Sequence, residues 1–108
     1  MADREIIDIV RRYLVALPGV GIHAPRAVLF GSYARGDSDE WSDIDIIVIA
    51  PEFDGPRTLE QVQQLWMATA SADNRIEPIP CGLNEWKTEQ GRPILDIARR
   101  EGVVVTAA

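Results

Sequence analysis

The chain has 108 residues, of which 46% are hydrophobic and 26% charged, and 11 Lys and Arg residues stand against 17 Asp and Glu residues. This length is typical of one small domain, and no apolar run approaches the roughly 20 residues that a membrane-spanning helix needs. The formal charge of −6 argues against direct nucleic-acid binding, because basic side chains on phosphates supply most of the affinity of such proteins. We therefore expect a single domain over residues 1–108 that works in the cytoplasm, with no signal peptide and no membrane contact.

The first predicted element is a helix over residues 3–17. Pro18 and Gly19 end this helix. A short apolar run over residues 26–30 is rich in strand-forming side chains and predicts a strand, and residues 32–35 predict one helical turn. The expected apolar face of the first helix consists of side chains that recur at helical spacing: Ile6, Val10, Tyr13, Leu14 and Leu17.

Residues 44–49 are almost continuously Ile and Val, which predicts a strand covered on both faces. After a loop, residues 58–71 have the pattern of a second helix. A further short strand is predicted over residues 74–80, where Pro78 lacks a backbone donor, so this strand should lie at a sheet edge or pair irregularly. The apolar side of the second helix is expected to contain Leu59, Val62, Leu65, Trp66 and Thr69.

The C-terminal part of the chain predicts two more helical pieces and a last strand. Asn84 is expected to cap a short helical turn. Residues 93–100 have the pattern of a helix, with proline in its first turn and Gly102 at its C-terminal stop. Residues 103–106 predict a strand. Because strands alternate with helices along the chain, we expect an α/β layer structure.

Residues 29–50, LFGSYARGDSDEWSDIDIIVIA, contain the most informative pattern in the chain. Asp43 and Asp45 lie two residues apart at the start of a strand, so their side chains point to the same face. Two carboxylates held this close repel each other and raise each other's pKa unless a cation lies between them. Carboxylate oxygens are ligands that Mg²⁺ prefers, together with substrate phosphates. The pair therefore predicts a divalent-cation site, although Asp-x-Asp alone also arises in solvated loops.

Gly31 and Ser32 lie where the preceding strand ends and the helical turn begins. Glycine allows the backbone to approach a phosphate closely, and free N–H groups together with the serine hydroxyl bind phosphate oxygens. Taken alone, the pair is more typical of a tight turn with a helix cap. Together with the two aspartates on the neighbouring strand, it predicts a site for a nucleoside triphosphate with magnesium.

The blocks GSYARG and SDIDIIV resemble the signature Gly-Ser-x-Ala-Arg-Gly followed by Ser-Asp-x-Asp of the DNA polymerase β-type nucleotidyltransferases, and most closely the minimal nucleotidyltransferases (MNT). The resemblance implies a polymerase β-like fold, an α/β (α+β two-layer) domain with a short mixed sheet and flanking helices. On the matching positions, Gly31 and Ser32 would hold the triphosphate of ATP, and Asp43 and Asp45 would bind two Mg²⁺ ions. The implied reaction is transfer of AMP from ATP, with release of pyrophosphate.

The family also uses a third acid on a later strand. Glu77 is the best candidate, because an acid between Ile76 and Ile79 in a short strand is out of place unless it faces a site. It would bind the catalytic metal or accept the proton of the incoming hydroxyl. Asp73 is the alternative third acid. Arg35 would either reach the phosphates or pin the loop to a carboxylate at the rim of the site.

The resemblance also suggests a partner. Larger relatives carry a second, helical domain, and this chain ends before one, so we expect it to dimerise or to receive its acceptor from another protein. Minimal members resemble the antitoxins of two-gene modules whose toxins are helical HEPN ribonucleases, which implies AMP transfer to a tyrosine of such a toxin. Two alternatives stay open: a binding antitoxin that blocks the toxin by contact without catalysis, and transfer to a small molecule, as in antibiotic-modifying relatives.

Three other residues bear on function. Cys81 is the one cysteine of the chain, which excludes an internal disulfide and fits a reducing compartment. A catalytic pair of Cys81 with His23, the one histidine, has no supporting constellation, so we expect a packed or idle cysteine. Trp41 could stack on a nucleotide base, but a partly packed loop tryptophan is the commoner case.

Overall fold

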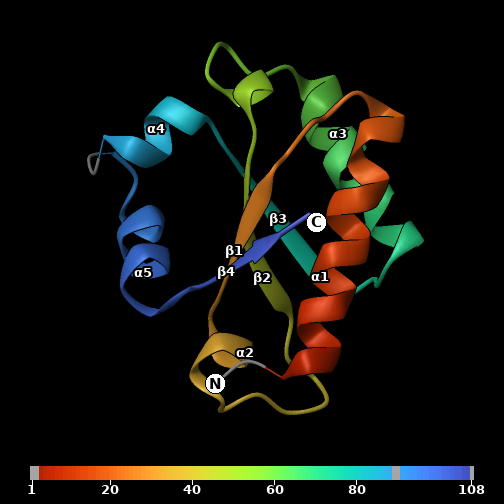
Figure 1. Cartoon of the computed structure of the whole chain (residues 1–108), viewed down its shortest axis with the longest axis vertical. Helices are drawn as coiled ribbons and strands as arrows, with labels where there is room; N and C mark the ends of the chain where they lie inside the picture. The colour runs from red at the N-terminus through yellow and green to blue at the C-terminus, as the bar shows by residue number, and fades with distance from the viewer. Residues whose placement is uncertain (1–2, 89–90, 108) are drawn as a thin grey trace.

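The computed structural model describes residues 3–88 and 91–107, and within them four strands form one mixed sheet in the order β3-β2-β1-β4. Strand β1 runs antiparallel to both β2 and β4, whereas β2 and β3 run parallel (Figure 1). The expected α+β fold with a short mixed sheet and flanking helices is therefore confirmed. The strands are β1 (Arg26–Phe30), β2 (Ile44–Ile49), β3 (Ile76–Cys81) and β4 (Val103–Thr106).

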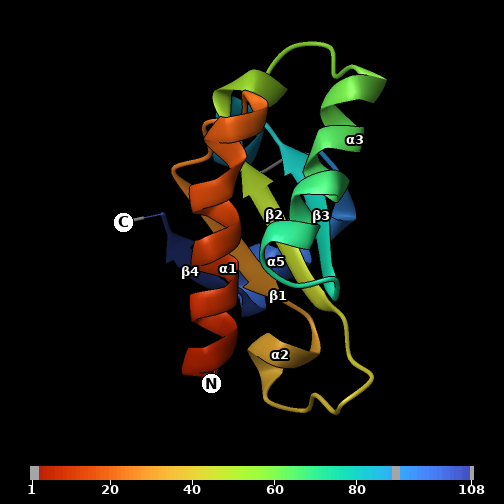
Figure 2. The same cartoon turned by 90° about the vertical axis from the view of Figure 1, so that its right-hand side faces the viewer.

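Helices cover both faces of this sheet. Helices α1 and α3 lie on one face and α5 lies on the other, as the side view shows (Figure 2). None of the helices in the described part of the chain is long and apolar enough to cross a membrane. The helices are α1 (Arg4–Ala16), α2 (Ser32–Arg35), α3 (Leu59–Met67), α4 (Leu83–Lys87) and α5 (Pro93–Glu101), with 3-10 turns η1 (Leu17–Val20), η2 (Pro51–Phe53) and η3 (Ala68–Ser71).

Helix α1 forms where the sequence predicts it. The Asp3 side chain caps its start by accepting a hydrogen bond from the Glu5 N–H at 3.3 Å. All five side chains of the predicted apolar face are buried. The hydroxyl of Tyr13 donates to the Leu65 carbonyl at 2.7 Å, which ties α1 to α3 and satisfies a buried polar group. Burial of this hydroxyl raises the pKa of Tyr13 well above its ordinary value.

Strands β1 and β2 are buried on both faces, as predicted for residues 44–49, and their side chains alternate between two cores. The core on the α1 side includes Ala27, Leu29, Ile46 and Val48. The core on the α5 side includes Val28, Phe30, Ile47 and Ile49, packed against Leu95 and Ala98. Both helical layers are therefore anchored to the two central strands.

Strand β3 lies at a sheet edge, as Pro78 predicts. It begins at Ile76, two residues later than expected, because residues 73–75 form a turn in which the Arg75 N–H donates to the Asp73 carboxylate at 2.8 Å. The last strand, β4, occupies the other edge with the predicted bounds.

The predicted apolar side of α3 is partly wrong. Leu65 and Thr69 are buried, but Leu59 is 72% exposed and Trp66 47% exposed. A capping box between Thr58 and Gln61 fixes the start of this helix. Leu65 and the following 3-10 turn η3 pack onto the sheet. Leu59 and Trp66 therefore face solvent.

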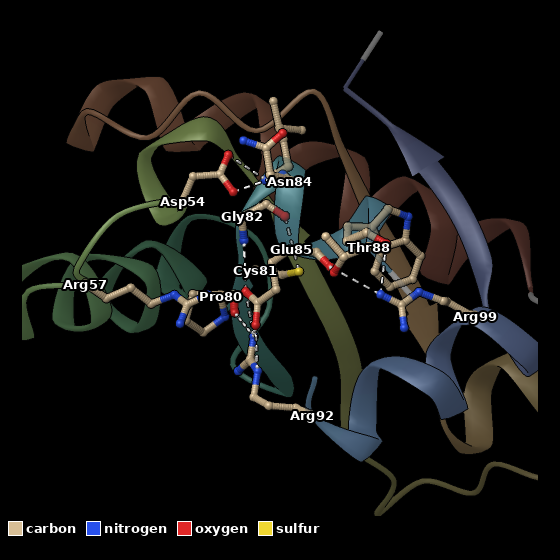
Figure 3. Close-up of polar contacts among 12 residues, drawn as sticks. Asp54, Arg57, Pro80, Cys81, Gly82, Asn84, Glu85, Thr88, Arg92 and Arg99 are labelled. Atoms are coloured by element: carbon tan, nitrogen blue, oxygen red, sulfur yellow. Dashed lines mark hydrogen bonds and ion pairs between the residues drawn. The ribbon is translucent and has the colours of Figure 1, made fainter. Parts of the chain in front are cut away.

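Asn84 does not cap α4, contrary to the prediction, because it lies inside that helix. The carboxylate of Asp54 caps the helix instead, accepting hydrogen bonds from the Leu83 N–H at 3.1 Å and the Asn84 N–H at 2.9 Å (Figure 3). Sequence patterns missed this cap because Asp54 lies about thirty positions before the helix that it caps.

Gly102 follows α5, as predicted, but for a different reason. Its φ of −79° is an extended conformation that any residue adopts, so no left-handed turn is present. A Cβ atom at this position would collide with the Ala98 carbonyl and with the Val28 side chain. Gly102 therefore allows the end of α5 to pack tightly against β1.

Candidate active site

The predicted site residues lie at one end of the neighbouring strands β1, β2 and β3. Gly31 follows the last residue of β1, and Asp45 lies at the beginning of the antiparallel β2, where it pairs with Phe30. Glu77 pairs with Asp45 across the parallel strands β2 and β3. Because paired residues point to the same face of a sheet, Asp45 and Glu77 share the face on which α5 packs. Asp43 lies two residues before Asp45, so in an extended chain its side chain points to the same side as that of Asp45.

Desolvation and neighbouring carboxylates shift the pKa of Asp45 and of Glu77. Burial raises the pKa of Asp45, and the charge of Asp43 raises it further. Partial desolvation by neighbouring groups also raises the pKa of Glu77, although its side chain is exposed, and so do the charges of Asp43 and Asp45. Hydrogen bonding between the carboxyl groups of Asp45 and Glu77 lowers the pKa of Asp45 and raises the pKa of Glu77. Desolvation is therefore the largest cause of both shifts, and repulsion from Asp43 adds to it.

The donor set fits a hard divalent cation, since it consists of carboxylate oxygens on one side of the sheet. Within residues 3–88 and 91–107, however, no group of three or more acidic, histidine or cysteine side chains already has the arrangement of a metal site. Asp43 and Glu77 are exposed and can therefore reorient when a ligand arrives. The structure thus places the three acids together without presenting a preformed cage.

Gly31 adopts a backbone conformation that is almost restricted to glycine, with φ of 76° and ψ of −155°. A Cβ atom at this position would lie 2.5 Å from an Oδ2 atom of Asp45. The strand end therefore approaches the Asp45 carboxylate more closely than any side chain would allow. Ser32 begins α2 directly after this turn, and its hydroxyl has no hydrogen-bond partner among the described residues.

Arg35 lies at the rim of the site and pairs with two carboxylates. Its Nε atom donates to Asp37 at 3.2 Å, and its Nη1 atom donates to Glu101 at 3.2 Å. These contacts raise the pKa of Arg35, chiefly through Asp37. They match the interpretation in which Arg35 is pinned to a carboxylate at the rim, and its contact with phosphate stays a prediction.

Asp73, the alternative third acid, is engaged elsewhere. Its carboxylate accepts two hydrogen bonds from the Arg75 guanidinium, at 3.0 and 2.8 Å, and this pairing lowers the pKa of Asp73. The same guanidinium donates to the hydroxyl of Tyr33 at 2.9 Å. Glu77, by contrast, faces Asp45, so the geometry favours Glu77 as the third acid.

Sequence reasoning missed two residues near the site, Arg75 and Glu101. The proximity of Arg75 to Asp73 in sequence was a usable signal for an ion pair. No sequence signal marked Glu101, which reaches Gly31 and Arg35 from the end of α5 through tertiary packing.

Trp41 is 84% exposed, so the expectation of a partly packed loop tryptophan is wrong. Its backbone N–H donates to the Asp39 carboxylate at 2.8 Å, and the Asp39 N–H donates to the Ser42 hydroxyl at 2.9 Å. These bonds hold the loop in a tight turn whose tryptophan side chain projects into solvent two residues before Asp43.

Cys81 is buried, as expected, and its thiol donates to the Gly82 carbonyl (Figure 3). Burial raises the pKa of its thiol to about 11, so the nucleophilic thiolate is scarce near neutral pH. His23 lies against Glu52, with 2.9 Å between its Nδ1 atom and a carboxylate oxygen. The two residues therefore have separate partners and do not form a catalytic pair.

Comparison with known proteins agrees with this geometry. Residues 5–80 match the family model described as "Nucleotidyltransferase domain". A protein of Methanocaldococcus jannaschii, named "Putative protein adenylyltransferase", is 37% identical over 62 residues. That similarity covers 56% of this chain and 60% of the relative, so the chain spans less than two thirds of the relative's length. The family match includes β1, β2 and Glu77, and the chain belongs to the nucleotidyltransferase domain family.

Proposed function

We propose that the chain transfers AMP from magnesium–ATP to a hydroxyl group of a protein, and that the acceptor is a tyrosine of a helical HEPN-type ribonuclease toxin. The observation that carries this proposal is the placement of Asp43, Asp45 and Glu77 on one side of the sheet, directly beside the glycine turn at Gly31. Membership of the nucleotidyltransferase family supports the reaction class.

In the proposed reaction, an oxygen of the acceptor attacks the α-phosphorus of ATP. The bond from this phosphorus to the oxygen that bridges to the β-phosphate breaks, and pyrophosphate leaves. The Gly31 turn and the Ser32 hydroxyl would hold the phosphates, since the turn has no side chain and the hydroxyl has no partner among the described residues. Their contribution is to position the triphosphate for in-line attack.

Asp43, Asp45 and Glu77 would hold magnesium. Bound magnesium supplies charge neutralisation at the reacting phosphate and its leaving group. Glu77 is also placed to accept the proton of the acceptor hydroxyl, because it pairs with Asp45 across the sheet and its side chain is exposed to an incoming acceptor.

Two observations support a protein acceptor. The relative from M. jannaschii carries the name of a protein adenylyltransferase. The carboxylates are also exposed or half-buried at the surface, so a folded partner could present a side chain to them. The toxin as acceptor rests on the resemblance to minimal nucleotidyltransferases, and the net charge of −6 would favour encounter with a basic, RNA-binding partner.

The test is co-expression of this chain with the product of the neighbouring gene, followed by intact-mass measurement of that product. Mass added in units of AMP with the wild-type chain, and absent with Asp43→Asn, is the expected result. Asp8→Asn is the matched control, since it removes an exposed carboxylate on α1 and should leave the modification intact. Protection from toxicity by Asp43→Asn without added mass would instead favour a contact-only antitoxin. AMP found only on small molecules would reject a protein acceptor.

A further inference from the structure

The carboxylate of Glu101, the last residue of α5, contacts two residues of the candidate site. Its Oε1 atom accepts a hydrogen bond from the Gly31 N–H at 3.4 Å and another from the Arg35 guanidinium at 3.2 Å. Gly31 is a residue that we expect to contact the triphosphate, and Arg35 is the rim residue that would either reach the phosphates or stay paired with a carboxylate. Glu101 itself belongs to none of the motifs in the sequence.

Tertiary packing brings Glu101 to this position. Strands β1 and β4 are antiparallel, and Leu29 pairs with Val103. Gly31 lies two residues after Leu29, and Glu101 lies two residues before Val103. In an antiparallel pair these two positions lie opposite each other, so Gly31 and Glu101 are at the same level of the sheet. Gly102 holds the end of α5 tightly against β1, since a Cβ atom there would collide with Ala98 and Val28. The Glu101 backbone is therefore fixed beside the glycine turn.

The side chain of Glu101 remains free to leave. It is 29% exposed, and its partner Arg35 is 47% exposed, so both can exchange this contact for water at low cost. The Gly31 N–H is a single donor and cannot bind a carboxylate and a phosphate strongly at the same time. The negative charge of the Glu101 carboxylate, which lies at hydrogen-bond distance from the Gly31 N–H, would also repel an incoming polyphosphate.

We propose that Glu101 is a competitor built into the nucleotide site, occupying the Gly31 N–H and Arg35 in the nucleotide-free chain and withdrawing when a triphosphate binds. This inference rests on the proposed function. Glu101 satisfies both donors while the site is empty and holds Arg35 at the rim. It thereby lowers the affinity for nucleotide, and removal of its charge should raise that affinity.

The test compares ATP binding to the wild type, Glu101→Gln and Asp96→Asn by calorimetry in the presence of magnesium. Asp96→Asn is a matched control, because it removes one carboxylate from the same helix, where Asp96 pairs with Arg99 at 3.0 Å, away from Gly31. Glu101→Gln should bind ATP about three- to tenfold more tightly, a factor typical of losing one partly exposed ion pair and one repulsion. Asp96→Asn should bind like the wild type. Inorganic tripolyphosphate should show the same order, because the competition concerns the phosphates.

A second readout does not depend on nucleotide. The NMR resonance of the Gly31 amide proton should shift in Glu101→Gln without ligand and stay in place in Asp96→Asn. Should Glu101→Gln fail to fold, Glu101→Asp tests the same contact, since the shorter side chain keeps the charge but loses reach, and it should tighten ATP binding by a smaller factor.

The outcomes separate this inference from the proposed function. Equal or weaker ATP binding by Glu101→Gln, with binding retained in the wild type, would overturn the inference alone. An unmoved Gly31 amide resonance would overturn it as well. Absence of ATP binding in all three chains would overturn both the inference and the proposed function.

Discussion

Asp45 on β2 and Glu77 on β3 are paired residues of a parallel ladder, and their carboxyl groups lie within hydrogen-bond reach of each other. Desolvation raises the pKa of both groups, and neighbouring negative charge raises them further. An acid pair of this kind costs stability in the free protein and becomes favourable when a cation binds.

Nucleotide binding should depend on divalent metal. The triphosphate and the three carboxylates are all negatively charged, so ATP alone meets repulsion that magnesium would remove. We expect calorimetry to show clear ATP binding with magnesium and much weaker binding with a chelator. Equal affinity under both conditions would reject the metal role of Asp43, Asp45 and Glu77.

Asp45→Asn should stabilise the metal-free protein while abolishing AMP transfer. A carboxyl group whose pKa is higher in the folded than in the unfolded state binds more protons when folded. The wild type therefore loses stability as the pH rises from the unfolded pKa, about 3.9, through the raised folded pKa, and this loss is complete above it. Urea unfolding with a chelator should show a stability advantage of Asp45→Asn that is smallest at low pH and largest near neutrality. An advantage that shrinks as the pH rises would contradict this account.

Gly31→Ala should damage both the fold and the site. The positive φ costs on the order of 1–3 kcal/mol for a residue with a side chain, and the added methyl group would press on the Asp45 carboxylate. Gly19→Ala is the matched control, because a methyl group added at Gly19 would meet no atom within 4 Å and the residue has no positive φ. We expect the control to stay within about 0.5 kcal/mol of the wild type in chemical unfolding. Normal ATP binding by Gly31→Ala would show that the turn is not part of the site.

Glu77→Gln should reduce AMP transfer by about 10²- to 10⁴-fold if Glu77 acts as the base, and by more if it also binds the catalytic metal. Asp73→Asn should retain most of the activity per folded molecule, because the Asp73 carboxylate is held by Arg75. Its cost should appear as lost stability of at most about 1 kcal/mol, as for other partly exposed ion pairs. The reverse pattern, with activity lost in Asp73→Asn and kept in Glu77→Gln, would move the third acid to Asp73.

Cys81 should resist thiol reagents in the folded chain. Its thiol is buried and its pKa is about 11, so both access and the thiolate fraction are low near neutral pH. Labelling with a thiol-reactive chromophore should be slow in buffer and fast in denaturant. Rapid labelling of the folded chain would show that the thiol is reachable, and would reopen its role as a nucleophile.

The local elements follow from local chemistry, which is why the sequence predicts them well. Strand β1, the helical turn α2 and strand β2 have the predicted bounds, because their apolar runs and the intervening polar loop are each consistent with a single structure. The buried side of helix α3 is one exception. Its apolar residues allow more than one buried side, and only its packing on the sheet shows that Leu59 and Trp66 face solvent.

The sequence by itself predicted the residue types of the candidate site: a glycine-serine turn, two aspartates at the start of a strand, and an acid in a later strand. These residues lie in short segments where spacing alone decides which side chains share a face. Tertiary structure decided which acid faces Asp45, because strand register brings Glu77 opposite it, whereas a local turn binds Asp73 to Arg75. It also brought Glu101 to Gly31 across 70 positions of sequence. No local pattern predicts such a contact, since it depends on how β4 pairs with β1 and on how closely Gly102 allows α5 to approach the sheet.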